Sequence, residues 1–277
     1  MSHFITLVHI PEDEAEYAVT DYIDSIMEPF CQVTEDWNYL EFHNATSEIT
    51  ESYKTQTCDC VRMSGGKIIT CYDPLFYCNY TTVSGVIYQK SVGKSKQLKR
   101  TQKAEKLKLL PNYPVNKVYK TIEQYAEDYC DYKYNEDEDA YGYYDNPNGM
   151  WDWYQIGGRW LYKFLVSETA KQVITGEKSW ALSDETPETP NGYKWVAGAK
   201  KSDIELELMK SLKVDKTARI TSETLDLYAD LTDSYIQNGE FYSDFGAENE
   251  NEWAAMVKEY IDGIADNDFI TVVDCHV

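Results

Sequence analysis

The chain has 277 residues, enough for one large domain or two modest ones with a buried core. Aromatic residues make up 14% of it, which excludes a disordered acidic tail, and no apolar run is long enough to span a membrane. With 48 acidic and 26 basic residues the net charge is -22, which either serves solubility alone or favours basic partners over nucleic acid and anionic membranes.

The two ends of the chain each predict an apolar strand joined to an amphipathic helix. Residues 3–10 are apolar and β-branched and predict a strand buried on both faces, and residues 12–30 predict a helix with an acidic first turn. Residues 250–265 predict a second helix and residues 268–275 a last strand. We therefore expect an α+β fold in which the terminal strands pair in a mixed or antiparallel sheet, with the helices packed on one face.

The middle of the chain predicts inserted segments that form a second lobe or arm. Residues 67–71, after a Gly-Gly turn, and residues 81–88 predict two strands. We place the main α+β domain at residues 1–60 and 111–277, with residues 61–110 as an inserted strand pair and basic arm.

The inserted segment contains a local reversal of charge. Between Lys90 and Lys108 there are eight basic residues and one acidic residue. Such a segment is either a solvated linker or an arm that contacts an acidic partner, including the acidic face of another copy. The candidate contact residues are Lys96, Lys99 and Arg100, and their pairing with a second copy predicts a homo-oligomer.

A helix and an acidic loop are predicted after the basic arm. Residues 121–132 predict a helix with Thr121 as its N-cap, whereas residues 31–60, earlier in the chain, predict turns between short strands. The loop that follows the helix is the densest acidic block in the sequence. Its candidate partner-binding residues are Glu136, Asp137, Glu138 and Asp139.

Four cysteines lie within one short stretch of the chain: Cys58, Cys60, Cys71 and Cys78. They either bind zinc or are ordinary reduced thiols, and their spacing is unlike the Cys-x2-Cys pairs of structural zinc sites. The N-terminal residues have no positive segment and no small-residue cleavage site, so we expect no signal peptide and reduced thiols in a cytosol. No other cofactor is expected.

Histidines lie in or beside both terminal strands. His3 and His9 are separated by an even number of positions, which places both on one face of the first strand. His276 follows Cys275 at the other end of the chain. If the terminal strands are neighbours, these groups form either a metal or catalytic cluster or a set of ordinary core and edge histidines.

The most unusual segment is the aromatic run Asn146-Pro-Asn-Gly-Met-Trp-Asp-Trp-Tyr-Gln-Ile-Gly-Gly-Arg-Trp160. It predicts either a structural knot or a ligand or partner site, built from Trp151, Asp152, Trp153, Tyr154, Arg159 and Trp160. The chain has no Gly-x-Ser-x-Gly elbow, no His-Glu-x-x-His motif and no phosphate-binding loop. We therefore expect a binding protein and not an enzyme.

This aromatic run resembles a motif of a family of bacteriophage and prophage proteins, most of them of unassigned function. The family pattern includes an N-terminal His-Phe-Ile-Thr-Leu strand, here residues 3–7, and a final Val-Val-Asp-Cys-His strand, here residues 272–276. Pro29-Phe30, with an acidic aromatic stretch after it, also fits the pattern. The resemblance spans most of the chain, but its motif carries no known chemistry.

The resemblance implies a phage protein made in the cytoplasm of a host bacterium. Acidic phage proteins of this size without enzymatic motifs are similar to inhibitors of host defence, and an anti-Gabija protein fits in size and character. We therefore expect an inhibitor that binds a host defence nuclease complex and blocks its DNA binding or cleavage. Two alternatives are a small-ligand-binding protein or enzyme with a site around Trp151–Trp160, and a phage structural or assembly protein.

Overall fold

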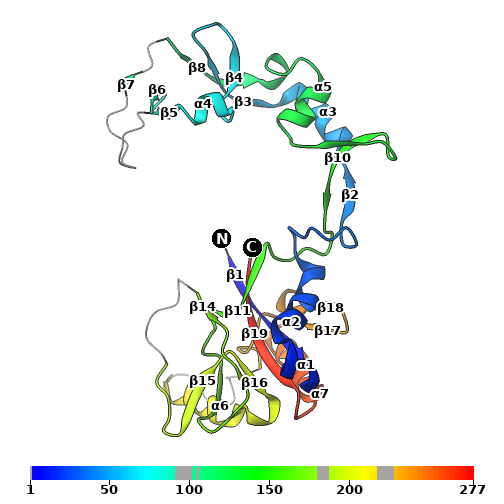
Figure 1. Ribbon diagram of the computed structural model, residues 1–277, viewed down its shortest axis with the longest axis vertical. Coiled ribbons are helices and arrows are strands. Elements are labelled where there is room, and N and C mark those ends of the chain that lie inside the picture. The colour runs from blue at the N-terminus through cyan, green and yellow to red at the C-terminus, as the bar shows by residue number, and fades with distance from the viewer. Residues whose placement is uncertain (1, 91–101, 104–105, 180–186, 217–227) are drawn as a thin grey trace. The chain divides into compact units, whose positions relative to one another are not determined.

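The computed structural model describes residues 2–90, 102–103, 106–179, 187–216 and 228–277 (Figure 1). It divides the chain into two compact units. Unit 1 consists of Met1–Glu41 and Asp145–Val277, and unit 2 is Phe42–Tyr144. Helices and strands are both abundant, so the predicted α+β class is confirmed. None of the described helices is long and apolar enough to cross a membrane.

The sheet of unit 1 is built on its two terminal strands. β1 (His3–Ile10) and β19 (Phe269–His276) pair antiparallel along their whole length, which confirms the predicted pairing. β1 also pairs parallel with β17 (Ser234–Gln237), so the sheet is mixed. The remaining strands of the sheet are β11 (Trp153–Gly158), β13 (Val173–Ile174), β14 (Glu177–Lys178), β16 (Gly198–Lys200) and β18 (Glu240–Ser243).

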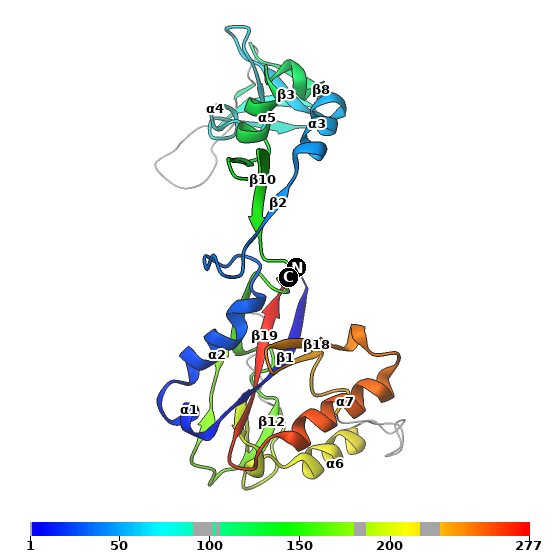
Figure 2. The same ribbon diagram turned by 90° about the vertical axis from the view of Figure 1, so that its right-hand side faces the viewer.

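Helices cover both faces of this sheet, which corrects the expectation that they pack on one. Ile5 and Leu7 of β1 share a core with α7 (Glu250–Gly263), to which α6 (Leu206–Lys216) also contributes. Val8 and Ile10 share another with α2 (Val19–Met27). Figure 2 shows α2 and α7 on opposite sides of β1 and β19. The physical reason is that both terminal strands are apolar on both faces, and each face needs its own cover.

The first helical segment is interrupted where one helix was expected. α1 (Glu12–Tyr17) and α2 are separated by Ala18, whose φ of -156° lies outside the helical region, and a short 3-10 helix, η1 (Glu28–Phe30), follows. After the break, Ile23 and Met27 of α2 pack in the core that contains Val8 and Ile10 of β1. Unit 1 also contains β12 (Phe164–Ser167), β15 (Tyr193–Val196), η3 (Lys201–Asp203) and η4 (Asp244–Gly246).

Unit 2 includes more of the chain than the predicted insertion at residues 61–110, because it extends from Phe42 to Tyr144. Its central strand β3 (Thr57–Arg62) lies between β4 (Ile68–Thr70) and β8 (Lys108–Pro114). The boundary differs because two helices outside 61–110 complete the core of this sheet. These are α3 (Thr46–Thr55), which contributes Ile49, and α5 (Ile122–Asp128), which contributes Tyr125.

Residues 81–88 form parts of a hairpin and not one strand. β5 (Tyr80–Val83) and β6 (Val86–Gln89) are joined by Ser84 and Gly85, with φ of 49° and 76°. Two residues with positive φ make the tight turn whose twist matches that of the paired strands. The other elements of unit 2 are α4 (Pro74–Tyr77), η2 (Val115–Lys117), β2 (Glu41–Asn44), β7 (Gln102–Lys103), β9 (Lys133–Asn135) and β10 (Ala140–Asp145).

Candidate functional site

The aromatic run and the two terminal strands meet at one end of the unit 1 sheet. β19 lies between β1 and β11 there, so that His276 is opposite His3 on one side and Trp153 on the other. Figure 2 shows both chain ends at this end of the sheet. Residues more than a hundred positions apart in sequence are therefore brought together by strand register. We call His3, Asp152, Trp153, Asp274 and His276 the histidine centre.

Each histidine of the centre is bound by a carboxylate. His3 Nδ1 lies 2.7 Å from Asp274 Oδ1, and His276 Nδ1 lies 2.6 Å from Asp152 Oδ1. The two imidazole rings meet edge to face with centroids 4.9 Å apart. The hydrogen bond from His276 holds the pKa of Asp152 below its ordinary value. An ionised carboxylate only accepts hydrogen bonds, so the Asp152 pair places the hydrogen of the His276 imidazole on Nδ1.

The glycine pair of the motif allows backbone to approach Asp274. Asp274 is fully buried, and its second oxygen accepts a hydrogen bond of 2.9 Å from the backbone amide of Arg159. Gly158 has φ of +52°, and a Cβ added to it would lie 2.4 Å from the Asp274 side chain. Only glycine fits this approach without displacement. Arg159 therefore contributes its backbone to the centre, and the residue itself is exposed.

The aromatic residues of the motif are distributed over different environments. Trp151 is fully buried among Phe rings, and Trp160 packs against the core to which α7 contributes. Trp153 is 41% exposed and stacks on the His276 ring at 5.0 Å. The structural-knot interpretation thus describes Trp151 and Trp160, whereas Trp153 is accessible.

Tyr154 lines a pocket that the other candidate residues of the motif do not share. Tyr154 donates a hydrogen bond to Asp24 and lines a pocket of about 460 Å³ that includes neither Asp152 nor Arg159. Burial, followed by the hydrogen bond to Asp24, raises the pKa of Tyr154. The alternative of a ligand site formed jointly by these motif residues thus receives no support from this pocket.

The predicted acidic loop is the turn of the β9–β10 hairpin in unit 2. Its four carboxylate residues, Glu136–Asp139, are exposed, and none forms an ion pair with any residue that the structure describes. Asn135 Oδ1 accepts from the amides of Asp137 and Glu138, so the turn has a defined shape. We call Glu136–Asp139 the acidic turn. Its proposed counterparts Lys96, Lys99 and Arg100 lie outside the described residues.

The four candidate zinc ligands do not form a metal site in the described part of the chain. The sulfur atoms of Cys58 and Cys60 lie 3.5 Å apart on β3, but Cys78 is exposed beyond α4. Burial raises the pKa of the Cys60 thiol, and it raises that of Cys71 to about 11. Zinc needs thiolates. Across the described residues no group of three or more His, Cys, Asp or Glu could hold a metal ion, so geometry gives zinc no support.

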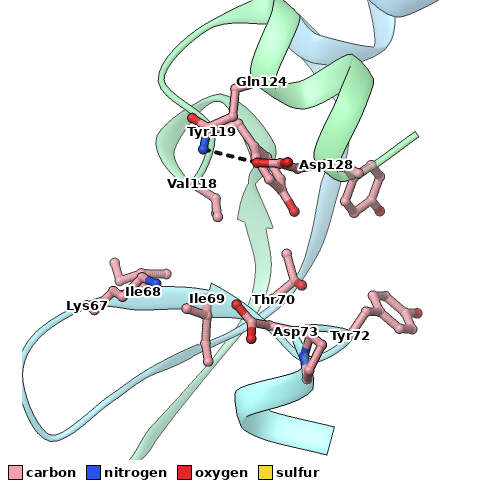
Figure 3. Close-up of a pocket in the computed structure, with 12 residues that line it drawn as sticks. Lys67, Ile68, Ile69, Thr70, Tyr72, Asp73, Val118, Tyr119, Gln124 and Asp128 are labelled. Carbon is pink, nitrogen blue, oxygen red and sulfur yellow. Dashed lines mark hydrogen bonds between the residues drawn. The ribbon is translucent and has the colours of Figure 1, made fainter. Parts of the chain in front are cut away.

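A pocket that the sequence did not indicate lies in unit 2 between β4 and α5. Its volume is about 670 Å³. Figure 3 shows Asp73 on the wall that continues from β4 and Asp128 on the facing wall from α5. We call it the β4–α5 pocket. It is lined by Lys67, Ile68, Ile69, Thr70, Tyr72, Asp73, Pro74, Val118, Tyr119, Gln124, Asp128 and Tyr129.

The described candidate residues thus occupy separate places: the histidine centre in unit 1, and the acidic turn, the cysteines and the β4–α5 pocket in unit 2. Comparison of the chain with protein-family models, with curated proteins and with solved structures finds no match.

Proposed function

We propose that the protein is a phage-encoded inhibitor that binds a host defence nuclease complex in the bacterial cytoplasm and blocks its DNA binding or cleavage. The observation that carries the proposal is the acidic turn. It presents Glu136–Asp139 to solvent at a hairpin tip, without neutralising partners among the described residues. The resemblance to phage proteins supplies the biological setting.

The charge of the whole chain supports the same mode of action. A protein of net charge -22 is repelled by DNA and attracted to the basic surface that a nuclease offers to DNA. Complementary charge speeds the encounter, while exposed aromatic side chains supply anchoring contacts. Tyr134, 47% exposed, lies beside the acidic turn and donates a hydrogen bond to Asp139. The hairpin thus offers carboxylates and an aromatic ring on one surface.

A pull-down from a host that carries the defence system tests this function. We expect the tagged protein to retain the defence nuclease, and the purified protein to inhibit DNA cleavage in proportion to its concentration. Excess duplex DNA added first should delay inhibition, because both ligands compete for one basic surface. Recovery of no nuclease, together with normal defence in cells that express the protein, would contradict the proposal. Stable incorporation into virions would instead indicate a structural or assembly protein.

The histidine centre favours a second candidate, acid–base chemistry on a small ligand. Two imidazoles lie 4.9 Å apart between ring centroids, each with a carboxylate on Nδ1, and the accessible ring of Trp153 stacks on that of His276. A carboxylate-fixed imidazole is the general base of many hydrolases. This candidate would make the chain an enzyme or a ligand-binding protein.

Chromogenic esters and phosphodiesters incubated with the purified chain test the second candidate. If it is correct, we expect turnover that His276→Gln reduces by about 100-fold, since a positioned acid–base group contributes on that scale. Tyr154→Phe is the control, because Tyr154 is on β11, the strand that pairs with the end of β19, but hydrogen-bonds Asp24. Absence of turnover, or equal turnover by His276→Gln and the parent chain, would exclude acid–base catalysis of these reactions at the centre.

A further inference from the structure

We propose that the β4–α5 pocket receives an arginine side chain of the bound partner protein. This inference rests on the proposed function, because it names the group on the basic partner surface that unit 2 would recognise. It concerns a place distinct from the acidic turn. The pocket lies entirely within unit 2, between β4, the turn that follows it, and α5.

Two carboxylates from facing walls make the pocket suitable for a cation. Asp73 Oδ1 accepts a hydrogen bond of 2.9 Å from the amide of Leu75, and Asp128 Oδ2 accepts one of 3.2 Å from Gln124. Both donors are neutral, and neither carboxylate forms an ion pair within the described residues. Figure 3 shows the two side chains on opposite sides of the space. One oxygen of each remains for a ligand.

The charge of the lining excludes an anion as the preferred occupant. Lys67 is the one basic residue in the lining, against Asp73 and Asp128, so the walls carry an excess of one negative charge. The net charge of the chain, -22, adds to it. The negative charge of the lining and that of the whole chain both repel an anionic ligand, and both attract a cation.

Tyrosine rings add a second kind of attraction for a cation. Tyr119 and Tyr129 pack with ring centroids 5.7 Å apart and both line the pocket, and Tyr72 is 72% exposed at its edge. Burial raises the pKa of Tyr119 to about 12, so this phenol stays neutral at physiological pH. Neutral aromatic faces attract guanidinium and ammonium groups, and they stack with planar guanidinium in particular.

Shape favours arginine over lysine. A guanidinium is a planar fork of five N–H donors that can bond more than one acceptor, whereas an ammonium is a compact point charge. The volume of about 670 Å³ is within the range of small-ligand pockets, and it leaves room for the backbone on either side of the arginine. The occupant is therefore a short partner segment centred on that residue.

Titration of the full chain with the peptide acetyl-Gly-Arg-Gly-amide, followed by ¹⁵N NMR, tests the pocket. We expect the amide signals of Leu75 and Gln124 to shift, and a citrulline peptide, which is neutral and nearly isosteric, to bind about ten-fold more weakly. Asp73→Asn and Asp128→Asn should each weaken arginine binding about five-fold. Asp131→Asn is the matched control, because Asp131 is exposed in unit 2 but does not line the pocket.

Equal affinity for the arginine and citrulline peptides would overturn the inference, and so would equal affinity for a lysine peptide.

The Asp73→Asn/Asp128→Asn double variant separates this inference from the proposed function. If the parent chain binds the nuclease and the double variant binds it equally well, the pocket does not receive the partner's arginine, although the inhibitor function stands. If the parent chain fails to bind the nuclease, the inhibitor function fails, and with it the assignment of the arginine to that partner. The peptide titration then still reports whether the pocket selects arginine. Circular dichroism spectra matching the parent confirm that the variants are folded.

Discussion

Replacement of Trp151 with alanine is expected to lower the free energy of unfolding by about 3–5 kcal/mol. The side chain is fully buried and packs against Phe4, Phe30 and Phe241. Its removal would leave a cavity bordered by three rings, each held by a different segment of unit 1. Chemical denaturation in urea, monitored by far-ultraviolet circular dichroism, measures the change.

Trp153→Ala is the matched control for this prediction. It removes the same kind of side chain two positions along the same motif, but Trp153 is 41% exposed. We expect a loss below about 1.5 kcal/mol, because much of the ring already contacts water. Equal losses in the two variants would contradict the assignment of Trp151 to the core and of Trp153 to the surface. Trp151→Phe should cost less than Trp151→Ala, since Trp151 Nε1 has no hydrogen-bond partner among the described residues.

The central strand pair of unit 1 could be predicted from sequence, because each of the two strands is marked by a continuous run of apolar residues. Residues 3–10 and 268–275 are apolar on both faces, and such strands belong in the middle of a sheet. Their pairing was therefore expected and is confirmed. Strands that are apolar on both faces also require helices on both faces of the sheet. The expectation of helices on one face did not take this into account.

Unit 2 was harder to predict because its core is assembled from weak, scattered signals. The helix α3 carries one fully buried residue, Ile49, so its apolar periodicity is slight, and turns were predicted there instead. By contrast α5 was predicted with its N-cap, and Thr121 does accept a hydrogen bond from Gln124. A local capping pattern can be seen in sequence, whereas a core shared between α3, β3 and α5 cannot.

The candidate sites also depend on contacts between distant segments that no local sequence pattern predicts. Proximity of His3 to His276 follows from strand pairing and was expected. Asp274 as the partner of His3 depends on the register of β1 against β19, and Asp152 as the partner of His276 depends on that of β11 against β19. In a chain with 48 acidic residues, no pattern distinguishes these two. Asp73 and Asp128 also lack a distinguishing pattern in sequence, and only the fold of unit 2 places them on facing walls.

Charge reversal of the acidic turn is expected to slow association with the defence nuclease by about ten-fold or more at low salt. The variant replaces Glu136, Asp137, Glu138 and Asp139 with lysine. Each is exposed at the hairpin tip, and the hydrogen bonds from the amides of residues 137 and 138 to Asn135 remain possible in the variant. Asp139 has φ of 48°, which lysine adopts less readily than aspartate, so a circular dichroism spectrum matching the parent is required. Stopped-flow or surface-based kinetics across a salt series measure the rate. The difference from the parent chain should shrink as salt rises, because at 1 M the screening length falls to about 3 Å.

A second variant with the same change of net charge decides whether the position of the charge matters. It reverses four exposed acidic residues in unit 1: Glu35, Glu168, Glu188 and Glu259. If steering depends on the local field of the acidic turn, this control slows association much less than the turn variant does, since its charges are dispersed over another unit. Equal slowing by both would mean that net charge alone governs the encounter. No slowing by either, at any salt concentration, would remove electrostatic steering from the proposed mechanism.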